Sequence, residues 1–255
     1  MWFLFLLLSF MPSISAAWTP VNVVDTQFHD RLVAHAGGEI RKFRYTNSLE
    51  ALDNSYSKGF RVFELDLELT NDDAVVLLHD WDYSMTHFYH AKPKRYSLLE
   101  FKSLKLQDGL THLEWKDFAS WMVKHPDARL ITDVKDKPIK MLERIKALSP
   151  ELTLRIIPQI YKFSEYDSVK EMGFDKIILS LYASDYSDDE IMNFTSSSTL
   201  WAVTMPAERA LAGDLAEKLG NMNIFTYAHL VDTDKQRRRL EERGLDGFYT
   251  AYLAP

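Results

Sequence analysis

The chain has 255 residues, 46% of them hydrophobic and 26% charged, which is enough apolar material for a packed core. Its formal net charge of -7 argues against a nucleic-acid binder, which usually presents a basic field. The absence of cysteine excludes disulfides, thiolate metal sites and a cysteine nucleophile. One basic run, at residues 235–239, lies beside Glu241 and Glu242 and is expected to be a solvated helix face.

An apolar run at residues 2–11 opens the chain and is too short to span a bilayer. Pro12 breaks the run, and Ser15-Ala16-Ala17 places small residues before a cut after Ala17. We therefore expect residues 1–17 to be a cleavable signal peptide and residues 18–255 to be a secreted or periplasmic protein. A buried N-terminal strand or an uncleaved anchor is the alternative.

Short apolar runs then alternate with amphipathic stretches. We expect strands at residues 32–34, 61–69, 74–78, 129–134, 153–157, 176–181, 199–204, 223–228 and 246–249. We expect helices at residues 47–58, 97–104, 114–124, 138–148, 164–172, 187–194, 207–219 and 232–243. In the first helix Asn47 is the expected N-cap, Glu50 completes a capping box, and Gly59 ends the helix. Residues 81–112 are irregular and aromatic, which indicates a long excursion.

This alternation favours an α/β protein with a single (β/α)8 TIM barrel over two smaller domains. An open doubly wound sheet is the competing architecture. The chain has neither the GxGxxG nucleotide fingerprint nor a P-loop.

The stretch FELDLELT at residues 63–70 alternates apolar residues with Glu64, Asp66 and Glu68, which predicts a strand with one acidic face. Like charges on one face repel each other, so the face needs either solvent or a bound cation. Barrel strands are covered on both sides except at the mouth formed by their C-terminal ends. A barrel therefore favours a cation for Glu64 and Asp66, whereas Glu68 is left to solvent or a salt bridge.

Further polar residues follow the predicted strands and should gather at the same mouth. Carboxylates supply the hard oxygen ligands that suit Mg²⁺ or Ca²⁺, a histidine pair suits acid–base chemistry or zinc, and a lysine suits an anionic group. Together these groups suit phosphoryl transfer. The residues are His35 after the first strand, Glu64 and Asp66 on the second, His79 after its continuation, Asp133 and Lys135 closing the third, and Gln159 after the fourth.

The order of four segments resembles the signature of the glycerophosphodiester phosphodiesterase family. They are HAGG (35–38), NSLEA (47–51), GFRVFELDLELTNDD (59–73) and VLLHD (76–80), with weaker echoes in TDVK (132–135), NIFTYAHLVD (223–232) and GLDGFYTAY (244–252). The resemblance implies a TIM barrel and a metal-dependent hydrolase that releases glycerol 3-phosphate and an alcohol. It implies His35 and His79 as acid and base, Glu64 and Asp66 as metal ligands with Asp133 where the family has Glu, and Lys135 as a phosphate contact.

Four positions depart from the family pattern. Ala36 stands where the family has a phosphate-binding arginine, Thr46 replaces a glutamate, His229 an asparagine and Ala251 an aspartate. A basic residue of the following loop is expected to take over the role of the arginine. The candidates are Arg41, Lys42 and Arg44, of which we predict Arg44.

Several alternatives stay open. A phospholipase C or D-like enzyme acting on phosphoinositides or lysophospholipids has the same residue plan, and an aspartate as third ligand resembles the venom sphingomyelinase D group. A barrel that binds phosphodiesters without turnover is the non-enzymatic alternative. The sequence leaves open which histidine is the base, whether Asp80 orients His79, and the oligomeric state. Trp81, Tyr83, Phe88 and Tyr89 either line the mouth, where they could contact a membrane surface, or pack the excursion.

Overall fold

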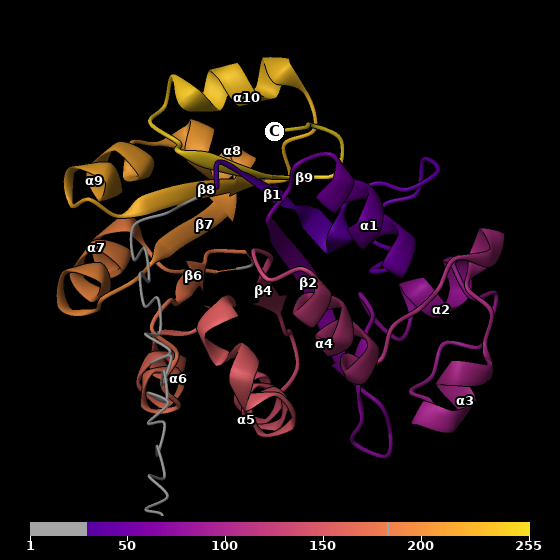
Figure 1. Ribbon diagram of the computed structural model, residues 1–255. Coiled ribbons are helices and arrows are strands. Elements are labelled where there is room, and N and C mark those ends of the chain that lie inside the picture. Colours follow the sequence, from indigo (N-terminus) through magenta and orange to yellow (C-terminus); the bar gives the residue numbers. More distant parts are fainter. Residues whose placement is uncertain (1–29, 183) are drawn as a thin grey trace, which may run out of the picture.

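Parallel strands close into a barrel in this computed structural model, which describes residues 30–182 and 184–255 (Figure 1). Each strand pairs with the next, and the first pairs with the last, so within the described residues the barrel leaves no open edge. The predicted TIM barrel is confirmed. Its strands are β1 (Leu32–Ala34), β2 (Val62–Leu69), β4 (Arg129–Asp133), β5 (Ile156–Ile160), β6 (Ile178–Ser180), β7 (Ala202–Pro206), β8 (Phe225–His229) and β9 (Gly247–Thr250).

Helices surround the barrel because one face of every strand is apolar. On β2, Phe63, Leu65 and Leu67 are buried in the outer core between strands and helices. No helix in the described ranges is long and apolar enough to cross a bilayer. The helices that surround the barrel are α1 (Leu49–Ser57), α4 (Trp115–Lys124), α5 (Pro138–Leu148), α6 (Tyr166–Glu171), α7 (Asp188–Ser197), α8 (Ala207–Ala212), α9 (Leu215–Asn221) and α10 (Asp234–Glu241).

The excursion stands outside the barrel and has a core of its own. Strand β3 (Val75–Leu77) pairs antiparallel with β2 and leads to α2 (Tyr83–His87) and α3 (Leu98–Ser103), where only one short helix was predicted. In Figure 1 these two helices lie apart from the helices around the barrel. Of the four aromatic residues in question, Trp81, Phe88 and Tyr89 are buried in this second core, whereas Tyr83 is 47% exposed.

Two predicted element boundaries were wrong. Strand β5 lies at 156–160 rather than 153–157, because Pro150–Arg155 forms a 3-10 turn. In that turn Leu152 is buried and Leu154 is exposed, although their spacing imitates the alternation of a strand. The helix predicted at 207–219 is split into α8 and α9 at Gly213, whose backbone is extended.

The predicted capping box was also wrong. The N-cap of α1 is Ser48, whose hydroxyl accepts a hydrogen bond from the Ala51 amide at 3.3 Å. Glu50 instead accepts bonds from the amide and hydroxyl of Thr111, both at 2.8 Å. Asn47 lies in the left-handed region with φ 48, and its side chain turns toward Asp66. A cap would satisfy one helix amide, whereas Asn47 holds a buried carboxylate.

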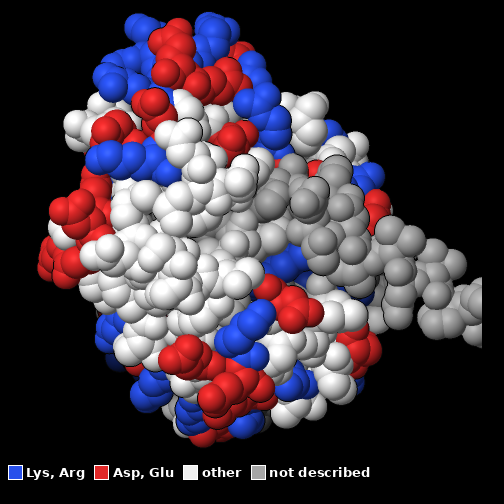
Figure 2. All heavy atoms as spheres, turned by 90° about the vertical axis from the view of Figure 1, so that its left-hand side faces the viewer, with Lys and Arg blue, Asp and Glu red and all other residues white. Residues whose placement is uncertain are grey.

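Figure 2 shows basic and acidic side chains intermixed over the top of the molecule, where α10 lies in Figure 1. Within α10, Arg237 pairs with Asp234 at 3.0 Å. The predicted solvated helix face is therefore confirmed for the basic run. The predicted signal peptide lies outside the described residues and stays a prediction.

Candidate active site

The acidic face of β2 points into the barrel near its mouth. Glu64 and Asp66 are only 1% and 2% exposed. Strand β4 pairs with β2 so that Asp133 stands directly beside Asp66. One oxygen atom from each of the three carboxylates lies within 4.8 Å of the others. Solvent therefore does not account for this face, and a bound cation remains the better explanation. Glu68 pairs with Arg95 at 3.5 Å, one of the two roles expected for it.

The carboxylates are held, but not fully satisfied, by neighbouring donors. Glu64 Oε2 accepts a hydrogen bond from the Ala36 amide at 2.9 Å, while its buried Oε1 has no partner among the described residues. Asn47 Nδ2 donates to Asp66 Oδ2 at 3.0 Å. Lys135 Nζ lies 2.9 Å from Asp66 Oδ1 and 3.2 Å from Asp133 Oδ2. One ammonium facing three carboxylates leaves an excess of negative charge, so the donor set fits a divalent cation with oxygen ligands.

The pKa values of Glu64 and Asp133 reflect the same excess of negative charge. Burial raises the pKa of Glu64 well above its usual range, and the charges of Asp66 and Asp133 raise it further. Burial, followed by the charge of Asp66, also raises the pKa of Asp133. Burial acts in the same direction on Asp66, but Lys135 and then the two site histidines lower its pKa overall. A bound cation would favour the ionised form of all three groups.

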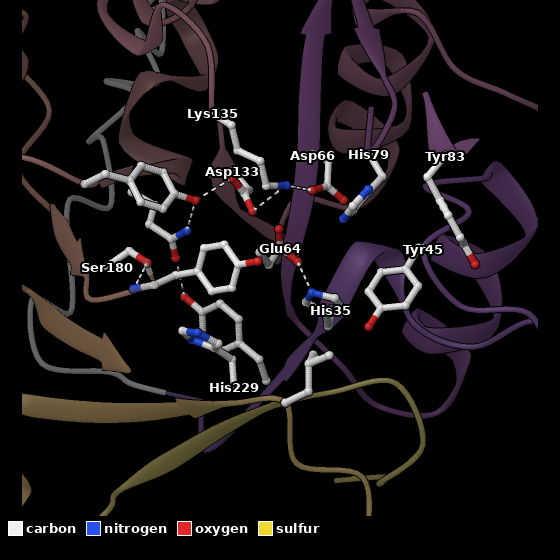
Figure 3. A pocket seen from close by; sticks show the side chains of 15 residues that line it. His35, Tyr45, Glu64, Asp66, His79, Tyr83, Asp133, Lys135, Ser180 and His229 are labelled. Atoms are coloured by element: carbon white, nitrogen blue, oxygen red, sulfur yellow. Dashed lines mark hydrogen bonds and ion pairs between the residues drawn. The ribbon is translucent and has the colours of Figure 1, made fainter. Parts of the chain in front are cut away.

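Both predicted histidines reach the same cavity, which has a volume of about 310 Å³ (Figure 3). His35 Nε2 lies 3.7 Å from Glu64 Oε2, and burial lowers the pKa of His35 to about 4. His79 Nδ1 hydrogen-bonds Asp80 Oδ2 at 2.5 Å. Asp80 Oδ1 also accepts bonds from backbone amides at the start of α2. Asp80 is thus both the partner of His79 and a turn residue.

A chain of hydrogen bonds crosses the opposite wall of the cavity. Tyr249 Oη lies 3.3 Å from Gln159 Oε1, and Gln159 Nε2 donates to Tyr161 Oη at 2.9 Å. Tyr161 Oη then donates to Asp133 Oδ1 at 2.5 Å. Gln159 therefore lines the cavity as predicted, although it lies within β5 rather than after it. The sequence analysis missed both tyrosines, although Tyr161 and Gln159 share the parity that places residues on one face of a strand.

His229 ends β8 and forms part of the same wall. Its Nδ1 lies 2.9 Å from Thr204 Oγ1, and its buried Nε2 has no partner among the described residues. Burial, and to a smaller extent His35, lowers the pKa of His229 to about 4. The imidazole is therefore neutral at ordinary pH and offers one unused polar atom to the cavity.

Arg44 is the predicted site residue that does not line the cavity. Its Nη1 bonds Asp232 Oδ2 at 3.1 Å, and its guanidinium lies over the rings of Tyr45 and Tyr252. The other predicted residues all line the cavity. They are His35, Glu64, Asp66, His79, Asp133, Lys135 and Gln159.

Residues 36–253 match the model of the glycerophosphoryl diester phosphodiesterase family. The chain belongs to this family. It is therefore a phosphoric diester hydrolase.

Solved structures of glycerophosphodiester phosphodiesterases share the fold at low identity. The enzyme from Thermotoga maritima is 18% identical, with a TM-score of 0.68 over 88% of this chain and 95% of the other. One from Parabacteroides distasonis is 17% identical, with a TM-score of 0.69 over 87% and 92%. An Oleispira antarctica phosphodiesterase, solved with the product sn-glycerol-3-phosphate, is 14% identical, with a TM-score of 0.68 over 88% and 93%.

Proposed function

We propose that this family member hydrolyses glycerophosphodiesters to glycerol 3-phosphate and an alcohol, using a divalent cation and the pair His35 and His79. The observation that carries the proposal is the meeting of both imidazoles and three carboxylates at one cavity. The bound product in the Oleispira antarctica structure supports the same substrate class. The predicted signal peptide supports a secreted or periplasmic location.

Glu64, Asp66 and Asp133 would hold the cation, Mg²⁺ or Ca²⁺, because all their ligand atoms are hard oxygens. When bound, the ion neutralises charge on the phosphate oxygens and makes phosphorus more electrophilic. Lys135 carries the only permanent positive charge among the described residues that line the cavity. We assign to Lys135 the contact with a second phosphate oxygen, which compensates for the missing arginine at Ala36.

The two histidines divide the proton transfers between them. One imidazole removes the proton from a glycerol hydroxyl next to the phosphate, and that oxygen attacks phosphorus. The other imidazole donates a proton to the departing alkoxide, so that a neutral alcohol leaves and a cyclic phosphate remains. Water then opens the ring with the roles of the histidines reversed. Asp80 fixes the His79 ring by its bond to Nδ1, which leaves Nε2 for the transfer.

A lysophospholipid or phosphoinositide is the second candidate substrate. Tyr83 and Tyr182 line the cavity and are 47% and 54% exposed at its rim. Tyrosine rings of this kind pack well against the boundary between lipid head groups and acyl chains. A lipid-bearing substrate, taken from a membrane surface, would therefore meet aromatic side chains at the mouth.

A panel of phosphodiesters tests the proposal. Glycerophosphoethanolamine, glycerophosphocholine, a lysophospholipid and a phosphoinositide are each incubated with the signal-free enzyme, with Mg²⁺, Ca²⁺ or EDTA. We expect cation-dependent release of glycerol 3-phosphate from the two glycerophosphodiesters, and a fall of at least about 10²-fold in His35→Ala and His79→Ala. His90→Asn, at an exposed residue outside the cavity lining, is the control. Full activity in EDTA or in His35→Ala would contradict the proposal.

A further inference from the structure

Tyr45 lies against both histidines of the candidate active site. Its ring centroid is 5.1 Å from that of His35 and 5.3 Å from that of His79, and both pairs meet edge to face. Figure 3 shows the ring beside both imidazoles at one side of the cavity. A single side chain therefore contacts two rings that follow different strands. Edge-to-face contacts are directional, so this arrangement restricts the tilt of each imidazole.

The backbone at Tyr45 is held in an unfavourable conformation. Its φ of 65 lies in the left-handed region, which glycine or asparagine adopts far more readily than tyrosine. Such a conformation persists only where the surrounding structure enforces it, and it is often found at functional sites. The presence of a bulky aromatic residue here indicates that the ring itself is needed.

The preceding residue, Arg44, forms an ion pair beside the Tyr45 ring. Arg44 bonds Asp232 at 3.1 Å and lies 5.5 Å from the centre of the Tyr45 ring. Asp232 is in turn fixed to the end of β9, where it accepts bonds from Thr250 Oγ1 at 3.2 Å and the Ala251 amide at 2.9 Å. The loop after β1 is thus fastened to the end of β9, the strand that pairs with β1.

We propose that Tyr45 is a positioning residue that holds His35 and His79 at a fixed separation and tilt, and that Arg44 acts through Tyr45 rather than on the substrate. The proposal rests on the acid–base roles of the two histidines proposed above. It also explains why Arg44 lies outside the cavity although it is close to the site in sequence. The hydroxyl of Tyr45 is not needed for this role, because both contacts are made by the ring.

The test compares two substitutions of Tyr45 that separate the ring from the backbone. Tyr45→Asn removes the ring but introduces a residue that readily adopts the left-handed conformation, whereas Tyr45→Phe keeps the ring. We expect kcat for glycerophosphoethanolamine to fall about 10- to 100-fold in Tyr45→Asn, with KM changed less than about threefold, because small displacements of catalytic groups act mainly on kcat. Tyr45→Phe should restore most of kcat. His90→Asn, at another left-handed residue that lies outside the cavity lining, is the matched control.

A readout independent of turnover accompanies the kinetics. In histidine-labelled protein, NMR relaxation should show more ring motion for His35 and His79 in Tyr45→Asn and wild-type ring motion in Tyr45→Phe. Asp232→Asn, which weakens the ion pair but keeps the ring, should increase the motion of the same two rings by a smaller amount. His35→Ala tests the acid–base proposal separately, since its full activity would remove that role whatever Tyr45 does. Wild-type kcat and wild-type ring motion in Tyr45→Asn would overturn the proposal, and so would an equal loss of kcat in Tyr45→Phe.

Discussion

The ammonium of Lys135 lies 2.9 Å from a carboxylate oxygen of Asp66. The amine also lies 3.2 Å from Asp133, so a divalent cation held by Asp66 and Asp133 would compete with Lys135 for carboxylate oxygens. The charges of these carboxylates raise the pKa of Lys135 although burial opposes it, so the amine stays charged. With such an ion in place, the ammonium of Lys135 would be available for a phosphate oxygen of the substrate.

Replacement of Lys135 should separate its competition with the cation from its contact with the substrate phosphate. In Lys135→Met we expect tighter binding of Mg²⁺ or Ca²⁺, because the competing charge is gone, together with a KM raised about tenfold or more, because a charge-assisted phosphate contact is lost. Isothermal titration with each ion and steady-state kinetics measure the two changes. Lys140→Met removes an exposed lysine that pairs with Asp73 and serves as the control. Weaker ion binding in Lys135→Met would contradict the competition.

Tyr161 should orient the carboxylate of Asp133, the third proposed metal ligand, through its hydrogen bond to Oδ1. In Tyr161→Phe the carboxylate loses a donor that fixes its orientation, and we expect affinity for the divalent cation to fall about tenfold. Tyr166→Phe is a matched control, because the hydroxyl of Tyr166 bonds the backbone of Thr199 instead. The ion-binding constants of both variants, measured by calorimetry, test the effect. Equal affinity in Tyr161→Phe and wild type would leave Tyr161 with a packing role only.

His229 should make stability depend on pH. Its pKa is lowered to about 4 in the folded protein by burial, while a histidine in the unfolded chain titrates near ~6.5. Between these values the unfolded chain binds more protons, so His229 costs stability progressively as pH falls, by up to about 1.4 kcal/mol per pH unit. Urea unfolding of wild type and His229→Gln from pH 7 to 4.5 isolates this contribution, because the other groups titrate in both proteins. Wild type should lose stability relative to the variant, and a constant difference would show that His229 does not stay neutral.

The barrel and most of the site were predictable because they depend on periodicity and on strand ends. Glu64 and Asp66 follow from alternation on one strand, and Asp133 from the rule that parallel strands end at one mouth. Asn47 was assigned the wrong partner, and Arg44 lies outside the cavity lining, for the same physical reason. Each bonds an aspartate far away in sequence, Asp66 and Asp232 respectively, whereas a local pattern shows only neighbouring residues.

The remaining misses have the same origin. Tyr45 contacts two histidines that follow different strands. Its left-handed backbone could not be predicted, because tyrosine rarely adopts that conformation. The turn at Pro150–Arg155 imitates a strand, because its apolar spacing cannot reveal which leucine is buried. Ring contacts and the burial of individual leucines therefore depend on tertiary packing, which periodicity along the sequence does not report.

Strand β2 offers the most direct test of the central claim, that a divalent cation on the inward carboxylates supports hydrolysis. Glu64 and Glu68 lie on the same strand with the same parity, but only Glu64 belongs to the carboxylate cluster. The measurement is cation-dependent release of glycerol 3-phosphate by Glu64→Gln and Glu68→Gln, over a range of Mg²⁺ and Ca²⁺ concentrations. We predict a loss of at least about 10²-fold in Glu64→Gln and less than about threefold in Glu68→Gln. Wild-type, cation-dependent activity in Glu64→Gln would contradict the account.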